Sequence, residues 1–301
     1  MHDPNHIESE TGTPERTISI DGEVVSTCEE EEKKKPAKVK KFPVVELFGP
    51  VIQGEGTQAG QQTMFVRFGG CDFRCDMCDS LHAVEPQAIQ KHATYMEAEE
   101  IYTQLEDART RTGVRWVTFS GGNPCMHKLD ALVDLLLENN WYINVETQGS
   151  IYQEWLRKCT TVTVSPKPPG MGEAFNAEDF IDFLVKVGAR PVCIKVPVFY
   201  EADLEMVLYI QDTVDIALEQ MGFLPTDFVP YSYYLSLGNP YPPALSKTFD
   251  LVMKEPEGGL VNLLLHAYAR MSEEVLQDKR LKRWRFLPQL HVLVYGNEAG
   301  R

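Results

Sequence analysis

Strand-like and helix-like segments alternate along most of this 301-residue chain, and this alternation limits the possible folds more than any other feature. Runs of β-branched and aromatic residues are typical of strands, and apolar residues that recur every three or four positions are typical of amphipathic helices. A strand, a loop and a helix recur in this order about six times, which is typical of a parallel sheet with crossover helices. We therefore predict an α/β fold. The predicted strands cover residues 42–48, 63–68, 116–119, 142–147, 161–164, 192–196, 228–235 and 284–287, and the predicted helices cover 98–108, 129–137, 152–158, 177–187, 201–221 and 259–271.

No Gly-x-Gly-x-x-Gly motif follows the first predicted strand, so a dinucleotide-binding sheet is disfavoured. A partial barrel of the (β/α)6 type with mainly parallel strands fits the pattern better. Functional groups in such barrels gather at the carboxyl ends of the strands. The polar residues at predicted strand ends are Ser120, Glu146, Ser165, Lys167 and Lys195, and we expect them to face the same end of the sheet.

The chain divides by composition near residue 41. Residues 1–41 contain 10 acidic and 7 basic residues and little apolar periodicity, so we predict a flexible, charged N-terminal extension. Residues 42–301 are predicted to form the folded domain. The whole chain has a formal net charge of −15, so this domain is acidic, which argues against direct nucleic-acid binding.

Several features bear on the compartment of the chain. No apolar run approaches the length of about 20 residues that a membrane-spanning helix needs, so no membrane partner is expected. The first residues have neither the basic region nor the apolar core of a signal peptide. Seven cysteines in 301 residues are sparse and odd in number, which disfavours a disulfide framework. We predict a cytoplasmic protein with reduced cysteines.

Three of the cysteines lie close together, in the motif Cys71-x3-Cys75-x2-Cys78. Thiolates bind soft metals and iron–sulfur clusters. Three are one too few for a closed tetrahedral site, whereas a cube of four irons held by three cysteines leaves one iron open for a ligand that is not protein. A zinc site with His82 as its fourth ligand is the alternative, although zinc sites more often use two separated ligand pairs.

Other polar residues lie beside this motif and at the strand ends. Gln53 and Glu55 can read the donor and acceptor edge of a heterocycle, and Arg67 can hold a carboxylate. The pair Gly121-Gly122 lets a backbone approach a ligand closely, and either a tight turn or a ligand contact explains it. Outside the context of the cysteine motif, each of the charged residues would be explained by surface polarity alone.

The cysteine motif, together with Ser120-Gly121-Gly122-Asn123-Pro124, resembles the radical S-adenosylmethionine (SAM) superfamily. Within that superfamily, three further stretches resemble the 7-carboxy-7-deazaguanine synthase family of the queuosine pathway. They are residues 53–56, 65–71 and 78–80. Residues 164–169 and 286–291 resemble the longer form of that family. The resemblance extends from about residue 42 to the end of the chain.

The resemblance implies a radical SAM barrel and a lyase that uses a [4Fe–4S] cluster, SAM and Mg²⁺. The cluster would be held by Cys71, Cys75 and Cys78, with SAM on the fourth iron. A 5′-deoxyadenosyl radical would take a hydrogen atom from 6-carboxy-5,6,7,8-tetrahydropterin. Ring contraction and loss of ammonia would then give 7-carboxy-7-deazaguanine, and SAM would be regenerated.

The resemblance also assigns roles to individual residues. The substrate positions are Ile52, Gln53, Gly54, Glu55, Arg67 and Ser120, and the SAM positions are Met77, Cys78, Asp79, Gly122, Glu146, Ser165, Pro166 and Lys167. Ser80 stands where the magnesium ligand is usually threonine and supplies the same hydroxyl oxygen. Asn123 replaces the more usual glutamate of a Gly-Gly-Glu-Pro motif, so its contact should differ, since an amide cannot accept two bonds from an ammonium.

The implied partners are a pterin substrate, a reducing protein such as flavodoxin and a second copy of the chain. Two rival functions share part of the pattern. A glycyl-radical-enzyme activase would act on a protein, and residues 53–56 and Arg67 argue against it. A non-catalytic iron–sulfur or zinc-binding module would not need the polar strand ends.

Overall fold

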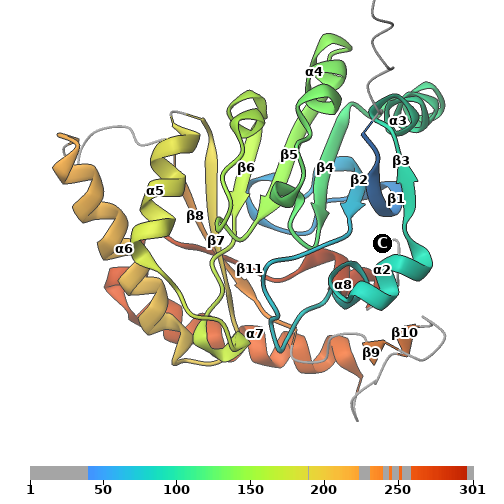
Figure 1. The fold of residues 1–301 in the computed structure, drawn as a ribbon. Coiled ribbons are helices and arrows are strands. Elements are labelled where there is room, and N and C mark those ends of the chain that lie inside the picture. Colours follow the sequence, from blue (N-terminus) through green and yellow to red (C-terminus); the bar gives the residue numbers. More distant parts are fainter. Residues whose placement is uncertain are drawn as a thin grey trace, which may run out of the picture. The chain divides into compact units, whose positions relative to one another are not determined.

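The computed structural model describes residues 40–188, 190–223, 231–239 and 259–296, and the backbone of two short strands at 244–245 and 251–252 (Figure 1). These residues belong to one unit, Val39–Arg301. The predicted N-terminal extension lies outside the described residues, apart from Lys40 and Lys41.

A nine-stranded sheet forms the centre of this unit, in the order β11-β8-β7-β6-β5-β4-β2-β1-β3. Neighbouring strands pair in parallel along the row β2-β4-β5-β6-β7-β8-β11, and β1 pairs antiparallel with both β2 and β3. The sheet is therefore mostly parallel and open between its edge strands β11 and β3, which confirms the predicted α/β class. The strands are β1 (Phe42–Ile52), β2 (Gln62–Phe68), β3 (Thr94–Met96), β4 (Trp116–Gly121), β5 (Tyr142–Thr147), β6 (Thr161–Val164), β7 (Val192–Val198), β8 (Tyr231–Leu237) and β11 (Arg285–Leu287), and a separate pair is formed by β9 (Ala244–Leu245) and β10 (Leu251–Val252).

Helices connect the parallel strands, and α3 to α6 lie along the outside of the sheet (Figure 1). Short 3-10 turns occur in the loops at residues 56–58, 124–126, 154–158, 169–171 and 279–281. Among the described residues, no helix has the length and apolar character needed to cross a membrane. The helices are α1 (Leu81–Val84), α2 (Pro86–His92), α3 (Ala98–Thr112), α4 (Asp130–Glu138), α5 (Ala177–Val187), α6 (Asp203–Gln220), α7 (Leu260–Gln277) and α8 (Leu290–Tyr295).

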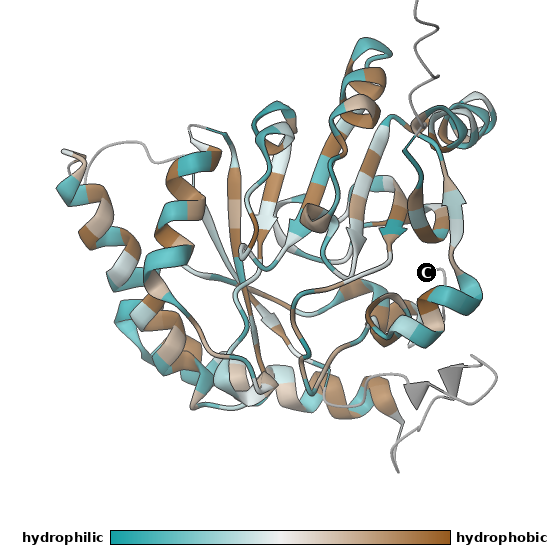
Figure 2. Ribbon diagram, viewed as in Figure 1, coloured by the Kyte–Doolittle hydropathy of each residue, from teal (hydrophilic) through white to brown (hydrophobic). Residues whose placement is uncertain are grey.

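The core lies between the sheet and the outer helices. All four residues of β6 are buried, as expected for a central strand with both faces covered. The helices bury one side only, so hydrophobic and hydrophilic positions alternate along them in Figure 2. In α3 the buried residues are Ala98, Ile101, Leu105 and Ala108, whose spacing places them on one face of the predicted helix.

Two local predictions differ from the structure. The stretch Thr94-Tyr95-Met96-Glu97 has the spacing of a capping box, which predicts Thr94 as the N-cap of α3. Thr94 does not cap α3, because it lies in β3 and its backbone pairs with Val44 of β1. Glu97 is the N-cap instead, and its capping box is closed by the Glu100 carboxylate, which accepts from the Glu97 backbone N–H at 2.7 Å. The helix predicted at 152–158 is a 3-10 turn over Glu154–Lys158.

Candidate active site

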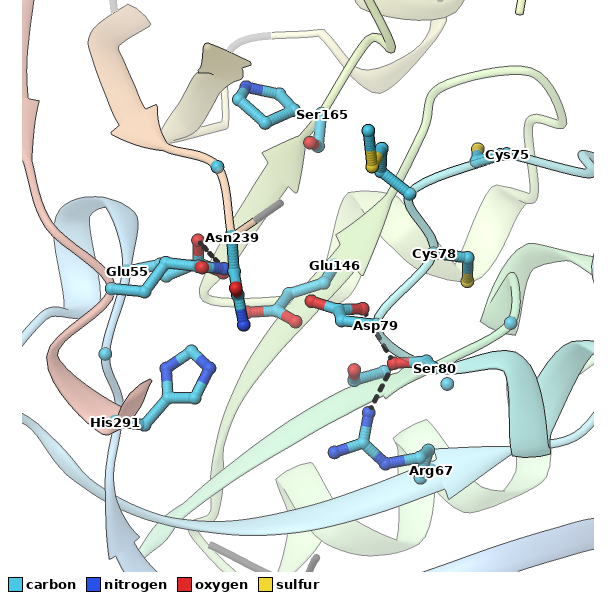
Figure 3. A pocket seen from close by; sticks show the side chains of 18 of the residues that line it. Glu55, Arg67, Cys75, Cys78, Asp79, Ser80, Glu146, Ser165, Asn239 and His291 are labelled. Atoms are coloured by element: carbon cyan, nitrogen blue, oxygen red, sulfur yellow. Dashed lines mark hydrogen bonds between the residues drawn. The ribbon is translucent and has the colours of Figure 1, made fainter. Parts of the chain in front are cut away.

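A cavity of about 230 Å³ lies at the carboxyl ends of the parallel strands (Figure 3). The loop that contains the three cysteines follows β2 at this end, so the expected convergence of loops on one edge of the sheet is observed. Of the residues assigned to the cluster, SAM, substrate or magnesium, only Pro166 does not line the cavity, and it is buried. The predicted residues that line it are Ile52, Gln53, Gly54, Glu55, Arg67, Cys71, Cys75, Met77, Cys78, Asp79, Ser80, Ser120, Gly122, Glu146, Ser165 and Lys167.

The three cysteines of the motif are free and partly exposed to the cavity. Burial raises the pKa of Cys75 to about 11 and that of Cys78 to about 12, so both are neutral thiols at pH 7 when no metal is bound. His82 does not complete a zinc site with them, because its Nε2 lies 3.1 Å from Glu46 Oε2. Among the residues that the structure describes, no three His, Cys, Asp or Glu side chains are placed to hold a single metal ion. Three thiols without a fourth protein ligand fit a four-iron cluster with one open iron better than they fit zinc.

The double glycine at the end of β4 packs directly against the end of β2 and the start of the cysteine loop. Gly121 has a φ of 126°, and a Cβ there would lie 2.1 Å from the carbonyl oxygen of Phe68. A Cβ on Gly122 would lie 2.1 Å from the carbonyl oxygen of Gly70. Both glycines also line the cavity. The pair is therefore required for backbone packing as well as being open to a ligand.

Arg67 connects β2 to β1 and to the end of the cysteine loop. Its Nε donates to Glu46 Oε2 at 2.7 Å, and one terminal nitrogen donates to Ser80 Oγ at 2.9 Å (Figure 3). Burial alone would raise the pKa of Glu46, but a hydrogen bond with His82 and the charge of Arg67 lower it overall. The guanidinium thus faces the cavity with one internal carboxylate already beside it.

Ser80 and Asp79 present two oxygen groups at the edge of the cavity. The Ser80 hydroxyl donates to Asp79 Oδ1 at 3.0 Å while it accepts from Arg67. A hydroxyl and a carboxylate oxygen are suitable ligands for a hard cation such as Mg²⁺. On the SAM side of the site, Lys167 donates to Ser165 Oγ at 3.1 Å.

Glu55 and Lys195 form a buried ion pair in the wall of the cavity, with 2.7 Å between carboxylate and ammonium and 11% of each side chain exposed. The other carboxylate oxygen of Glu55 accepts from Ser236 at 2.8 Å and from Gln289 at 3.1 Å. Burial alone would raise the pKa of Glu55, but the charge of Lys195, the nearby His291 and the hydrogen bonds from Lys195 and Ser236 lower it to about 2. Glu55 is therefore ionised at neutral pH.

Gln53 is fixed by groups on both sides of its amide. Its Nε2 donates to Glu146 Oε1 at 2.8 Å, and its Oε1 accepts from the backbone N–H of Gly54 at 2.7 Å. A substrate position and a SAM position of the sequence analysis are therefore in direct contact. Glu146 lies where the two predicted ligand regions meet.

Several cavity residues were not predicted from the sequence. Glu46 lies in β1 opposite Arg67 of β2. Pairing the first two predicted strands as an antiparallel hairpin could have suggested this contact. Gln289 and His291 arrive from the C-terminal segment, which carried no role although part of it contributed to the resemblance. The cavity residues without a predicted role include Glu46, Gln148, Asn239, Gln289 and His291.

Asn123 does not line the cavity and is completely buried. Its Nδ2 donates to Asp72 at 2.8 Å, and its Oδ1 accepts from Thr147 Oγ1 at 2.9 Å and from the backbone N–H of Cys125 at 3.1 Å. The amide is thus used within the protein, and nothing in these contacts leaves it facing a ligand.

The chain is similar to proteins of known family. The sequence profile of the Radical SAM superfamily matches residues 65–165. The 7-carboxy-7-deazaguanine synthase of Bacillus subtilis (strain 168) is 36% identical over 266 residues, which cover 87% of this chain and 99% of that protein. The enzyme of the same name from Bacillus cereus is 33% identical over 263 residues, covering 87% of this chain and all of that protein.

Among solved structures, QueE from Escherichia coli has a similar fold, with a TM-score of 0.52 and 24% identity over 83% of this chain and 94% of that chain. The relatives from Bacillus match along nearly their whole length, and the part of this chain that matches the superfamily profile contains the cysteine motif. This chain belongs to the 7-carboxy-7-deazaguanine synthase family of radical SAM enzymes.

Proposed function

We propose that this chain is a 7-carboxy-7-deazaguanine synthase. It is a radical SAM lyase that converts 6-carboxy-5,6,7,8-tetrahydropterin to 7-carboxy-7-deazaguanine by ring contraction and loss of ammonia. The observation that carries this proposal is that the cysteine loop and the predicted substrate residues line one cavity. The lining combines carboxylates, an amide and a guanidinium, which are the groups that recognise a polar heterocycle with a carboxylate.

Cys71, Cys75 and Cys78 would hold the [4Fe–4S] cluster, and the cavity beside them would hold SAM. When bound and reduced, this pair supplies the 5′-deoxyadenosyl radical that takes a hydrogen atom from the substrate. The SAM positions Met77, Asp79, Gly122, Ser165 and Lys167 line the cavity. Lys167 is the group we assign to a SAM carboxylate, because it lines the cavity and its ammonium donates to the Ser165 hydroxyl.

The substrate would lie between Gln53, Glu55 and Arg67. We add Glu146 to this group in place of the SAM role that the resemblance implied, because it accepts from Gln53 at 2.8 Å. The carboxylates of Glu146 and Glu55 accept hydrogen bonds only, so they suit the N–H groups of a reduced pterin. Arg67 suits the substrate carboxylate. Because Lys195 keeps Glu55 ionised and Gln53 holds Glu146, these acceptors are oriented before the substrate arrives.

We further propose that Mg²⁺ binds beside Ser80. The support is the Ser80 hydroxyl and the Asp79 carboxylate, which are in contact at the cavity edge. A cation at Ser80 Oγ would take the place of the hydrogen bond from Arg67 and free that guanidinium for the substrate. Metal binding and substrate binding would then favour each other.

The reaction needs a one-electron reductant, and we propose a flavodoxin-type protein in this role. A second copy of the chain as a partner is proposed on the resemblance alone. A cytoplasmic location is supported by the six described cysteines, which are all free.

The decisive experiment is anaerobic reconstitution of the full chain with iron and sulfide, followed by incubation with SAM, dithionite, Mg²⁺ and the carboxytetrahydropterin. We expect a deazapurine product and no net consumption of SAM. Formation of 5′-deoxyadenosine while the pterin remains unchanged would contradict the proposed substrate.

A further inference from the structure

Asp72, the residue after the first cysteine of the motif, is held by three side chains from the ends of β4 and β5. Asn123 Nδ2 donates to its Oδ1 at 2.8 Å, and Gln148 Nε2 donates to the same oxygen at 2.6 Å. Ser150 donates to its Oδ2 at 2.5 Å. Asp72 does not line the cavity, so this cluster of contacts does not serve substrate or SAM directly.

Gln148 differs from the other two donors because it also reaches a thiol. Its Nε2 lies 3.6 Å from Cys71 Sγ, within the range of a hydrogen bond to sulfur, and the side chain is buried at the cavity wall. A primary amide has two N–H groups, so one can point to Asp72 and the other to Cys71.

Asp72 determines which end of the Gln148 amide faces the cysteine. Asp72 accepts from Asn123 at one oxygen and from Ser150 at the other, so the nitrogen of Gln148 and not its oxygen faces it. Asp72 is in turn fixed by Asn123, whose own orientation is set by Thr147 and the backbone of Cys125. The chain of contacts therefore presents an N–H group to the sulfur of Cys71.

We propose that Gln148 is a positioning residue of the iron–sulfur site, which donates an N–H to the Cys71 sulfur and thereby raises the reduction potential of the cluster. The physical reason is that one-electron reduction adds negative charge to the cluster, and a hydrogen bond to a ligating sulfur stabilises that charge. Asp72 orients the amide. This inference rests on the cluster assignment of the proposed function and is independent of the pterin substrate.

The test compares two variants of the reconstituted full chain. Gln148→Leu removes the donor and keeps a side chain of similar size. Ser150→Ala is the matched control, because it removes a hydrogen bond to Asp72 and none to Cys71. The midpoint potential of the cluster is measured by redox titration monitored by electron paramagnetic resonance, alongside iron and sulfide content.

We expect the midpoint of Gln148→Leu to shift to a more negative potential at unchanged iron content, while Ser150→Ala stays at the wild-type value. An unshifted midpoint in Gln148→Leu, or an equal shift in both variants, would overturn the inference. A wild-type chain that forms no [4Fe–4S] signal would overturn the cluster assignment itself and this inference with it.

A second measurement covers the case in which Gln148→Leu does not take up a cluster. In the wild-type chain, labelled with ¹⁵N at the glutamine side-chain amides, electron–nuclear double resonance on the reduced cluster should detect coupling to an amide nitrogen and an exchangeable proton. Absence of both couplings would exclude a hydrogen bond from Gln148 to the cluster ligand.

Discussion

Arg67 donates hydrogen bonds to two groups of the protein, the carboxylate of Glu46 and the hydroxyl of Ser80. We expect Arg67→Ala to weaken pterin binding by roughly 10- to 100-fold, because a hydrogen bond to a charged group contributes about 1.5–3 kcal/mol. The Michaelis constant for the pterin measures the loss of pterin binding. Formation of 5′-deoxyadenosine without pterin turnover measures SAM cleavage separately.

Arg67→Lys is the matched control for that variant. Lysine keeps the charge and loses the planar fork, so pterin affinity should lie between those of the wild type and Arg67→Ala. SAM cleavage should remain in both variants. Unchanged pterin affinity in Arg67→Ala would contradict the assignment of this residue to the substrate carboxylate.

Cys75 provides a test of the cluster ligands. Cys75→Ala should abolish both the brown chromophore and turnover, because two remaining thiolates cannot hold a four-iron cluster with one open iron. Cys159→Ala is the control, since Cys159 is buried outside the cavity. Iron content and the visible absorption spectrum measure the result, and a coloured, active Cys75→Ala protein would show that the ligand assignment is wrong.

Residue by residue, the sequence predicted the groups at the ends of consecutive parallel strands and missed those that depend on distant pairing. Glu146 and Ser165 follow strand patterns that can be recognised locally, and parallel strands bring them to one edge. Glu46 depends on the register of β1 against β2, and irregularities in β1 shift that register. Gln289 reaches Glu55 across 234 positions of sequence, which no local pattern encodes.

At the scale of elements, the contact between the β4 end and the cysteine loop is the most restrictive one. We expect Gly122→Ala to lower the free energy of unfolding by more than 2 kcal/mol and to impair cluster uptake, because its Cβ would meet the backbone of Gly70 and cannot be accommodated by a side-chain rotation. Denaturant unfolding and iron content measure these effects.

Gly113→Ala is the control for that substitution. Gly113 ends α3 with a φ of 77°, and a Cβ there would meet nothing within 4 Å. Its cost is therefore only the left-handed backbone strain of about 1–2 kcal/mol, with normal cluster uptake. Equal effects of the two substitutions on cluster uptake would contradict a specific role for the glycine after β4.

The helices and strands were largely predictable where apolar residues recur with a single spacing, either that of a helix or that of a strand. The helix predicted at 177–187 matches α5, whose N-terminus is capped by Asn176. The interpretation of Thr94 as a cap was wrong because its backbone pairs with β1 as part of a strand. Local residue spacing does not reveal pairing with a distant strand. The short turn at 154–158 lacks the length to establish a regular helix.

At the scale of the whole molecule, the Glu55–Lys195 pair joins segments from four parts of the chain, since Ser236 in β8 and Gln289 near α8 also bind Glu55. We expect Glu55→Gln to lose about 3 kcal/mol of unfolding free energy at pH 7, because it leaves Lys195 buried without its partner. Chemical denaturation at several pH values measures this loss.

The pH dependence of that loss follows from the lowered pKa of Glu55, about 2 in the folded chain against an ordinary 4.5. The unfolded chain takes up this proton first, so the stabilisation is present above pH 4.5 and disappears as the pH falls toward 2. The difference between wild type and Glu55→Gln should shrink over that interval. The double variant Glu55→Gln/Lys195→Met should recover most of the unfolding free energy that Glu55→Gln loses at pH 7. A difference in unfolding free energy between wild type and Glu55→Gln that does not change with pH would contradict the mechanism.

The pairing of charges inside the cavity has a consequence for how ligands arrive. Arg67 and Lys195 each already contact an internal carboxylate, and Lys167 contacts a hydroxyl. The carboxylate of the pterin, which we assign to Arg67, therefore exchanges places with a protein carboxylate, and it is not drawn in from solution by an uncompensated charge at that residue. Its association rate should change little between low and physiological ionic strength, which stopped-flow binding can measure, and a steep fall with salt would contradict this. The site therefore selects a ligand by how well its carboxylate fits the place of the protein carboxylate, and not by long-range electrostatic attraction.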